Sequence, residues 1–471
     1  MTRHQGTLST VVLAVMALLC CSCSQAGQLL GQASPEPSLP SGVAVDFNHR
    51  DGARYRNPID GQWRNGDNLE ARLIAAIDAA QQECLVAVQE LSLPAVAQAL
   101  VRAQHRGVQV KVVLENSYRT PWSSQHPAGL AKHQRRRLER LQRLADQNGD
   151  GLLTPKERTE GDAIALLEQG GVPLIDDTED GSQGSGLMHH KFMVIDQRLV
   201  VTGSANFTSS GIHGDGGATR TRGNVNHLLQ MESRDLAQMF ANEFARMWGD
   251  GPRGLQNSQF GRGKGEPAVQ QVQIGAATVT VLFAPHAKSN PSNGLDLIAS
   301  ELGRARRSID MALFVFSSQQ LADTLETKSK QGVEIRLLAD PGFASRSFSE
   351  VLDLLGVSLP DHNCQIEPNN RPYTHPLEGV GTPRLARGDK LHHKFAVIDN
   401  KTVITGSFNW SPSAAHTNDE TLLIIESPDL AAHFTREMNR MWRGADLGIT
   451  ERMRRKLERQ RELCGSGSQR G

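Results

Sequence analysis

Alternation between apolar and polar positions divides most of the chain into predicted helices and strands. In the first half, helical periodicity covers Leu69 to Ala80 and Pro94 to Arg106, while Cys84 to Val88 and Val108 to Leu114 are short apolar runs typical of buried strands. Gly107 ends the second helix. Strands that alternate with helices predict parallel β-α units and an α/β fold class.

The second half repeats this order of elements. Leu295 to Ala305 and Ser318 to Gln331 have the pattern of helices, and Ile309 to Phe316 and Val333 to Leu338 have the pattern of strands. Further on, the segment LMHHKFMVID ending at Asp196 matches LHHKFAVID ending at Asp399. TGSAN matches TGSFN, and RMW occurs in both halves. The chain is therefore a duplicated domain, and the first copy carries an extra glycine-rich loop around residues 211–218.

Each copy contains a His-x-Lys motif at the start of an apolar run. Because side chains alternate across a strand, His189 and Lys191 are expected on one face and His190 on the other. Asp196 is an odd number of positions from both, so it is expected to face away. The hydroxyl and amide of the following strand complete a set suited to binding and attacking a phosphate group. The two sets are His189, Lys191, Ser204 and Asn206, and His392, Lys394, Ser407 and Asn409.

A single histidine on a strand is more often structural than catalytic, and that interpretation is kept for His190 and His393. Two copies of the same constellation at matching places argue against it for His189 and His392. The motifs His189-x-Lys191-x4-Asp196 and His392-x-Lys394-x4-Asp399, each followed by Gly-Ser-x-Asn, resemble the double motif of the phospholipase D superfamily.

The resemblance covers about residues 45–445 and carries several implications. It implies two α/β/α lobes related by a pseudo-twofold axis, with both motifs in one shared active site. One histidine would attack phosphorus to form a phosphohistidine, and the other would protonate the leaving alcohol and then activate water. The lysines, serines and asparagines would hold the phosphate oxygens, Asp196 and Asp399 would be structural, and catalysis would need no cofactor.

Members of this family often place a carboxylate downstream to orient a histidine. Glu420 fits that role for His392, whereas the aligned position of the first half is Asn226. A carboxylate partner raises an imidazole pKa more than an amide does. We therefore hypothesise that His189 is the neutral nucleophile and that His392 is the protonated general acid.

A second motif lies inside the first copy, within residues 131–168. It fits the twelve-residue calcium loop of an EF-hand, with a glycine at position 6 and a glutamate at position 12. Residues 131–145 and 155–168 are expected to form the flanking helices. The alternative is a solvated acidic turn; the motif favours Ca²⁺ bound as a structural brace. The predicted metal ligands are Asp146, Asn148, Asp150, Leu152, Thr154 and Glu157.

Residues 1–26 have the pattern of a signal peptide, with an apolar run too short to span a bilayer. We expect an exported protein, secreted or periplasmic; a lipid anchor on Cys23 is the alternative. The three cysteines of the remaining chain, Cys84, Cys364 and Cys464, allow at most one disulfide, and inert thiols are the default expectation.

The expected domain boundaries follow from these patterns. Residues 27–45 form a linker, 46–250 the first lobe, 251–277 a Gly- and Gln-rich linker, 278–446 the second lobe and 447–471 a basic tail. Lys plus Arg and Asp plus Glu both number 51, so no net charge steers the chain toward polyanions.

The sequence favours hydrolysis of phospholipid headgroup diesters at a membrane surface, and no obligate protein partner is evident. A nuclease is the first alternative, although balanced charge and only three tyrosines argue against a broad nucleic-acid groove. A transphosphatidylase of the cardiolipin synthase type and a catalytically silent calcium-dependent binding protein are the others. The intact His and Lys of both motifs argue against the last.

Overall fold

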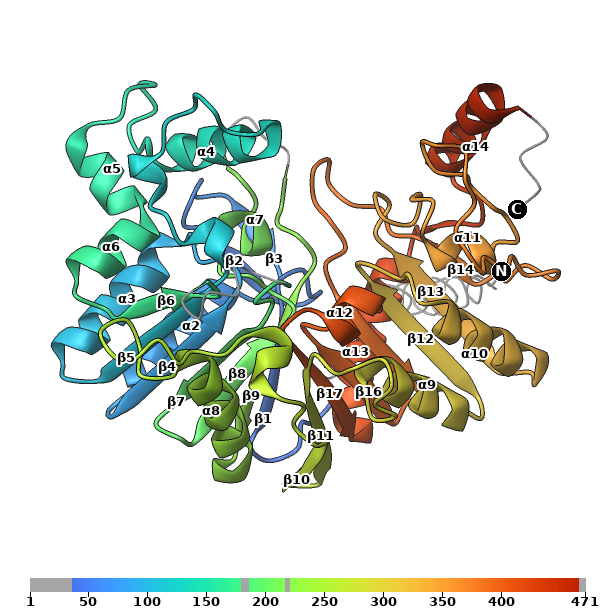
Figure 1. Cartoon of the computed structure of the whole chain (residues 1–471), viewed down its shortest axis with the longest axis horizontal. Coiled ribbons are helices and arrows are strands. Elements are labelled where there is room, and N and C mark those ends of the chain that lie inside the picture. The colour runs from blue at the N-terminus through green and yellow to red at the C-terminus, as the bar shows by residue number, and fades with distance from the viewer. Residues whose placement is uncertain (1–35, 179–185, 217–220, 466–471) are drawn as a thin grey trace, which may run out of the picture. The chain divides into compact units, whose positions relative to one another are not determined.

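The structure is a computed structural model that describes residues 36–178, 186–216 and 221–465. It divides into two compact units, Met1–Pro37 and Ser38–Gly471. The predicted signal segment 1–26, with Cys23, lies outside the described residues. All that follows concerns the second unit (Figure 1).

The first lobe is built on a seven-stranded mixed sheet in the order β1-β9-β8-β7-β4-β5-β6. Strands β4, β5 and β6 are parallel, and β7, β8 and β9 continue the sheet as antiparallel neighbours. The strands are β1 (Val43–Phe47), β4 (Glu83–Val88), β5 (Gln109–Leu114), β6 (Leu174–Asp176), β7 (Lys191–Ile195), β8 (Leu199–Gly203) and β9 (His227–Glu232), with a separate hairpin of β2 (Arg54–Arg56) and β3 (Trp63–Asn65).

The second lobe repeats this arrangement in a nine-stranded sheet, in the order β10-β11-β17-β16-β15-β12-β13-β14-β18. Its central strands have the same directions as their counterparts, with β12 parallel to β13 and antiparallel to β15. The strands are β10 (Gln270–Ile274), β11 (Ala277–Ala284), β12 (Ser308–Leu313), β13 (Glu334–Ala339), β14 (Val380–Thr382), β15 (Lys394–Ile398), β16 (Thr402–Gly406), β17 (Glu420–Glu426) and β18 (Asp446–Leu447).

Helices cover both sheets, as the amphipathic patterns predict. The first lobe has α2 (Leu69–Ala79), α3 (Pro94–His105), α4 (Lys132–Ala145), α5 (Pro155–Gly161), α6 (Ala163–Gln169), α7 (Ser209–Ile212) and α8 (Arg234–Trp248). The second has α9 (Gly294–Arg304), α10 (Gln319–Lys330), α11 (Glu350–Leu354), α12 (Pro412–His416), α13 (Pro428–Trp442) and α14 (Glu451–Cys464). Short 3₁₀ turns are η1 (Asn116–Tyr118), η2 (Trp122–Ser124) and η3 (Gly261–Lys264). The predicted α/β fold with two duplicated lobes is confirmed.

One continuous hydrophobic core joins the two lobes. It contains side chains of both sheets together with those of α8 and α13. Phe283 of β11 packs against Phe240 of α8 with ring centroids 5.0 Å apart, and Phe47 of β1 packs against Phe434 of α13 at 5.2 Å. Each lobe therefore inserts an aromatic ring beside the helix of the other, and burial of these rings holds the lobes together.

Several predicted boundaries differ from the structure. The expected linker 27–45 contains the start of β1. The expected linker 251–277 contains η3 and β10. Strand β10 pairs with β11, and Val272 and Ile274 are buried there. The expected helix over 155–168 breaks at Asp162, whose side chain accepts from two amides of α6 and caps that helix. The expected tail 447–471 contains α14.

Among the cysteines that the structure describes, Cys364 and Cys464 form a bridge at the end of α14 with Cα atoms 5.4 Å apart. The default expectation of inert thiols holds only for Cys84, which is free and buried. Within the described ranges, we find no helix with the length and apolar character of a membrane span.

Candidate active site

Both His-x-Lys motifs begin at the contact between the lobes. Strands β7 and β15 start at the motif lysines, and the residues just before them pair with the opposite lobe. The His189 amide donates to the Asp419 carbonyl at 2.9 Å, and the His392 amide donates to the Val225 carbonyl at 3.1 Å. Backbone hydrogen bonds across the lobe contact thus place the first motif beside the start of β17 and the second motif beside the start of β9.

This crossing determines the partner of His189. Its Nδ1 lies 2.8 Å from Oε2 of Glu420 in the second lobe. The Ser407 hydroxyl donates to the same oxygen at 2.6 Å. The expectation that Glu420 orients His392 is therefore wrong. Glu420 is the first residue of β17 in the second lobe, but its carboxylate reaches across the lobe contact to the histidine of the first lobe.

The partner of His392 is the amide of Asn226, whose Oδ1 lies 3.0 Å from Nδ1 of the ring. The Asn226 amide nitrogen donates to the Gly211 carbonyl at 2.8 Å, which identifies Oδ1 as the atom that faces His392. Ser204 donates to this Oδ1 at 2.7 Å. The Nδ1 partners of the two histidines therefore differ in charge, with a carboxylate for His189 and a neutral amide for His392.

The two lysines lie close enough to influence both rings. Lys191 donates to the His189 carbonyl at 2.7 Å and Lys394 to the His392 carbonyl at 2.8 Å. Burial lowers the pKa of Lys191 to about 7, and burial together with the Lys191 charge lowers that of Lys394 well below its usual value. Two desolvated cations at such a contact favour binding of an anion.

The same environment shifts the other titrating groups. Burial, followed by the charges of both lysines, lowers the pKa of His189 and of His392 well below the usual value. Burial raises the pKa of Glu420 to about 7. His189 and His392 are 6% and 7% exposed, whereas His190 and His393 are fully buried, so only the first pair reaches solvent. The site thus brings together the two imidazoles that the duplicated motif predicted.

The serines and asparagines lie where the sequence predicted, with one difference in their contacts. Each serine hydroxyl has one proton and uses it on Asn226 or Glu420, so donation to a phosphate would require that bond to be given up. Asn206 donates to Oε1 of Gln89 at 3.2 Å. Among the described residues, the Oδ1 atoms of Asn206 and Asn409 are buried without a hydrogen-bond partner. Oε1 of Glu420 is likewise buried without a partner. All three atoms accept hydrogen bonds, so they suit a donor group of a ligand and not a phosphate oxygen.

Asp196 and Asp399 point away from the histidines, as strand parity predicted. Asp196 accepts from the amides of residues 81–83, and Asp399 from those of residues 306–308. Both residues have positive φ, at 50° and 53°, and form the turn after the motif strand. Their carboxylates fix that turn to the start of β4 or β12, which supports a structural role.

A family model described as "Cardiolipin synthase, PLD-like domain" matches residues 73–248 and 298–442, more than half of the chain and one segment per lobe. This chain belongs to the phospholipase D superfamily.

Known proteins similar to this chain include a cardiolipin hydrolase and a phospholipase D. The mitochondrial cardiolipin hydrolase of Mus musculus is 29% identical over 162 residues, which are 34% of this chain and 62% of that protein. A phospholipase D of Rickettsia bellii (strain RML369-C) is 28% identical over 159 residues, 34% of this chain and 66% of that protein. The matches therefore span less than two thirds of these relatives.

A solved structure extends the similarity to nearly the whole chain. The phosphatidylserine synthase of Haemophilus influenzae Rd KW20 superposes with a TM-score of 0.56 at 13% identity, covering 94% of this chain and 96% of that one. At this identity the comparison establishes the two-lobed fold of the phospholipase D superfamily.

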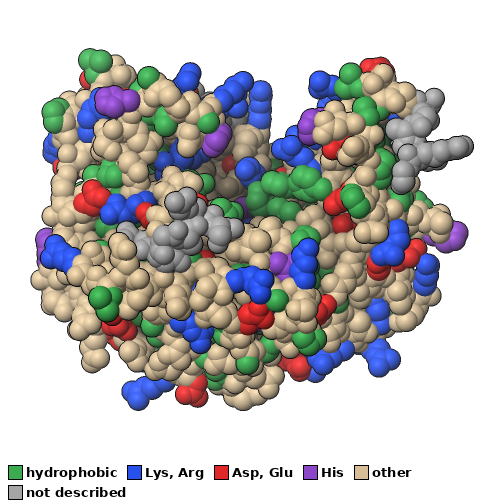
Figure 2. Space-filling view, in the orientation of Figure 1, with side chains coloured by type: hydrophobic (Ala, Val, Ile, Leu, Met, Phe, Trp, Pro, Cys, Tyr) green, Lys and Arg blue, Asp and Glu red, His purple; other side chains and the backbone are tan. Residues whose placement is uncertain are grey.

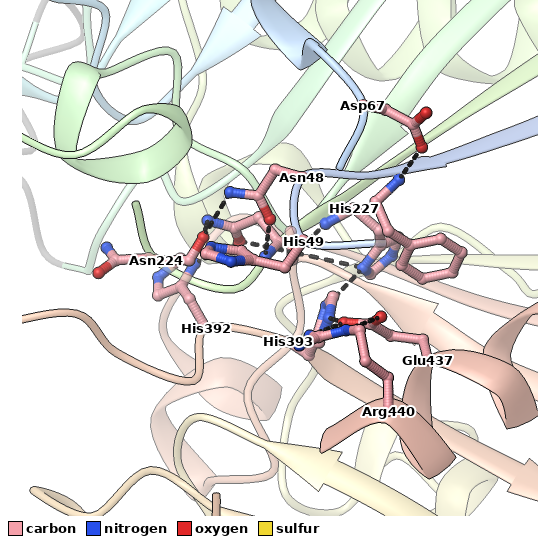
Figure 3. A network of polar contacts seen from close by, with 12 residues as sticks. Asn48, His49, Asp67, Asn224, His227, His392, His393, Glu437 and Arg440 are labelled. Atoms are coloured by element: carbon pink, nitrogen blue, oxygen red, sulfur yellow. Dashed lines mark hydrogen bonds and ion pairs between the residues drawn. The ribbon is translucent and has the colours of Figure 1, made fainter. Parts of the chain in front are cut away.

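The second histidine of each motif belongs to a buried network behind the site. His393 contacts Glu437 at 3.1 Å and His227 at 3.0 Å, and Glu437 pairs with Arg440 (Figure 3). His190 contacts Glu243 at 3.2 Å and Thr421 at 2.9 Å. His190 and His393 thus make buried packing contacts behind the site, as the sequence predicted.

Sequence reasoning missed Lys264, which supplies the buried cation of the first network. It pairs with Glu243 and, at 2.6 Å, with Asp419, and its side chain is 1% exposed. The equivalent cation of the other network is Arg440 of α13. The counterpart of Arg440 in the duplication is Arg246. It makes a longer contact of 3.5 Å with Glu243, and its side chain is 39% exposed. Lys264 lies in the expected linker, so alignment of the two copies gave no signal for it.

The predicted calcium loop lies between α4 and α5. Asp146 accepts from the amides of Gly149 and Gly151, at 2.8 and 2.9 Å, and both glycines have positive φ. Glu157 accepts from Gln147 at the start of the loop at 3.2 Å. Its carboxylate therefore closes the loop, and the oxygen donors of the predicted set suit Ca²⁺. No cluster of three or more His, Cys, Asp or Glu side chains that could hold a metal was found in the described part of the chain, so calcium binding here stays a prediction.

Proposed function

We propose that this protein is an exported phosphodiesterase that hydrolyses phospholipid headgroup esters through a phosphohistidine on His189. The observation that carries the proposal is the crossed pairing of His189 with Glu420 and of His392 with Asn226. It supports one shared site with unequal histidines, because each ring depends on the opposite lobe for its partner.

The unequal partners favour His189 as the nucleophile. A neutral imidazole that attacks phosphorus gains positive charge on its ring, and the adjacent carboxylate of Glu420 stabilises that charge. The amide of Asn226 gives His392 no such stabilisation, which makes its imidazolium the better proton donor. His189 is therefore the proposed nucleophile and His392 the proposed acid, although the carboxylate expected beside His392 lies beside His189.

In the proposed first step, the Nε2 lone pair of His189 attacks phosphorus while the bond to the headgroup oxygen breaks. That oxygen takes the Nε2 proton of His392 and leaves as the alcohol. The charges of Lys191 and Lys394 stabilise the phosphate oxygens. The anionic substrate in turn raises the pKa of His392 from its depressed value, which favours the protonated form that this step requires.

In the second step, neutral His392 takes a proton from water, and the water oxygen attacks phosphorus. The phosphorus–nitrogen bond breaks, its electron pair returns to His189, and phosphatidic acid is released. Replacement of water by a second alcohol would give transphosphatidylation by the same bonds. Hydrolysis is proposed as the main reaction.

Several features support a phospholipid as the substrate. The similar proteins include a cardiolipin hydrolase and a phospholipase D, and the matching family model is named for cardiolipin synthase. The equal numbers of acidic and basic residues argue against a polyanion groove.

Export is proposed on the signal-like segment 1–26 and on the Cys364–Cys464 bridge, because disulfides form and persist mainly in oxidising compartments. The intact mass of the chain purified from its host tests this. A chain that starts at Met1 would contradict export, and a lipid adduct on Cys23 would support the anchored form.

The proposed activity is tested with purified protein and labelled phosphatidylglycerol, phosphatidylcholine and single-stranded DNA, in EDTA. We expect release of the headgroup alcohol by the wild type and none by His189→Asn. Thr435→Ala, which alters a hydroxyl on α13 outside the site, is the matched control and should retain full activity. Cleavage of DNA alone would contradict the lipid proposal in favour of the nuclease.

A further inference from the structure

The two walls of the site differ at one pair of equivalent positions. Gln89 follows β4 and its amide donates to the His190 carbonyl at 3.0 Å; Phe314 follows β12 and its amide donates to the His393 carbonyl at 2.8 Å. The backbone is thus the same in both lobes, but the first lobe presents a polar side chain and the second an aromatic ring. A phosphodiester with two unlike alcohols would be recognised by a site with such unlike walls.

Phe314 lies directly beside the catalytic machinery. Its ring centroid is 4.7 Å from that of His392 and 4.5 Å from that of Phe343. The ammonium of Lys394 is 4.9 Å from the ring centre, and that of Lys390 is 5.4 Å from it. Phe348, a few residues further along the same loop, is 39% exposed. The second-lobe wall therefore combines apolar surface with positive charge.

The loop that carries Phe343 and Phe348 is held in place from two sides. Asp340 accepts from the Phe343 amide at 3.1 Å and, through its other oxygen, from the Leu391 amide next to His392 at 3.2 Å. From α14, Lys456 donates to the Ser345 carbonyl at 2.6 Å. The disulfide anchors the end of that helix. The aromatic wall is thus fixed relative to His392 before a substrate binds.

An apolar patch lies in a hollow on this side of the molecule (Figure 2). Figure 2 shows hydrophobic side chains at the bottom of a hollow in the upper part of the view, with Lys and Arg side chains on both sides of it. In the same orientation, α4 and α14 lie on the two sides of this region (Figure 1). An exposed apolar patch rimmed by charge is typical of a binding site.

We propose that Phe314, Phe343 and Phe348 form a subsite for the acyl-bearing alcohol of a phospholipid. This inference rests on the proposed function and names the part of the substrate that the second lobe contacts. In an in-line displacement the alcohol that stays on phosphorus lies off the line from the nucleophile to the leaving oxygen, so it can rest on a wall that flanks His392.

The surroundings of Phe314 favour hydrocarbon over a nucleobase. Stacking of a base requires an open ring face. Two ammonium groups, the His392 ring and the Phe343 ring already surround Phe314. Contact with the ring edges and with exposed Phe348 remains available to a glycerol backbone and to the first methylenes of acyl chains.

The test compares dioleoyl phosphatidylglycerol in mixed micelles with its deacylated form, glycerophosphoglycerol. In the double variant Phe343→Ser/Phe348→Ser we expect kcat/KM to fall about tenfold or more for the acylated substrate, from the lost apolar contact. We expect a change of less than about twofold for the deacylated one, which makes no such contact. Leu255→Ser alters a leucine that is 74% exposed and should change neither.

The outcomes separate this inference from the proposed function. Equal losses on both substrates, or no loss on either, would overturn the subsite while leaving the phospholipase activity intact. A fall confined to single-stranded DNA cleavage would overturn it in favour of a nucleobase platform. Absence of phosphatidylglycerol hydrolysis by the wild type would overturn the proposed function, and the subsite with it.

Discussion

Glu420 of the second lobe and His189 of the first are joined by a 2.8 Å contact between Oε2 and Nδ1. Because this contact crosses the duplication, neither lobe contains a complete site. The reciprocal contact, from Asn226 to His392, has an amide in place of the carboxylate. These two contacts give the equivalent histidines of the two copies different partners, and so explain how the histidines could have different roles.

Loss of the Glu420 carboxylate should slow the covalent step. We expect Glu420→Gln to lower kcat by about 100-fold or more, as in other sites where a carboxylate supports a catalytic histidine. The loss should persist with a 4-nitrophenyl phosphodiester, whose leaving group needs no proton, since it is attack by His189 that is impaired. His392→Asn should release the first equivalent of 4-nitrophenol at a nearly normal rate. A normal first release in Glu420→Gln would contradict the pairing.

The pH profile of kcat/KM should be bell-shaped with its maximum near 7. Burial raises the pKa of Glu420 to about 7, so its supporting carboxylate is lost as the pH falls below that value. Burial lowers the pKa of Lys191 to about 7, so its phosphate-binding charge is lost as the pH rises above it. Steady-state kinetics from pH 5 to 9 would measure both limbs. An unchanged acidic limb in Glu420→Gln would show that another group is responsible.

Removal of the buried cation Lys264 should destabilise the lobe contact. Lys264→Met leaves Glu243 and Asp419 buried without it, and we expect a loss of about 3–5 kcal/mol in the free energy of unfolding. Arg246→Met, at the equivalent of Arg440, is the matched control. The Arg246 side chain is 39% exposed and 3.5 Å from Glu243, so its loss should cost less than about 1 kcal/mol. Equal losses in urea unfolding would show that Lys264 does not brace the contact.

Calcium should stabilise the first lobe without serving the chemistry. We expect 1 mM Ca²⁺ to raise Tm by about 2–4 °C or more through preferential binding to the folded state. Glu157→Gln should abolish the increase, because Glu157 is the predicted closing ligand. Glu160→Gln, in the same helix but outside the loop, should keep it. Complete loss of hydrolysis in EDTA would contradict a purely structural role.

Much of this architecture could be predicted from residue patterns. Periodicity gave the β-α units, and the repeated motif gave two lobes and placed His189 with Lys191 on one strand face. Strand parity also placed Asp196 away from the site. These features depend on local geometry, which alternation along a strand determines directly.

The partners of the histidines could not be found in the same way. Alignment of the copies matches Glu420 with Asn226 and suggests that each serves the histidine of its own copy. The contact that forms instead depends on how the lobes pack, which no pattern within one copy encodes. Lys264 and Phe314 were missed for a similar reason, because their roles arise where the copies differ.

The central claim is that two lobes form one site in which His189 carries the covalent intermediate. The most direct measurement is peptide mass spectrometry of His392→Asn after rapid mixing with a 4-nitrophenyl phosphodiester, since this variant can form the intermediate but lacks the base that activates water. We predict a phosphoryl adduct on the peptide that contains His189 and no adduct in His189→Asn. An adduct on His392 in the wild type, or sustained turnover by either single variant, would contradict the claim.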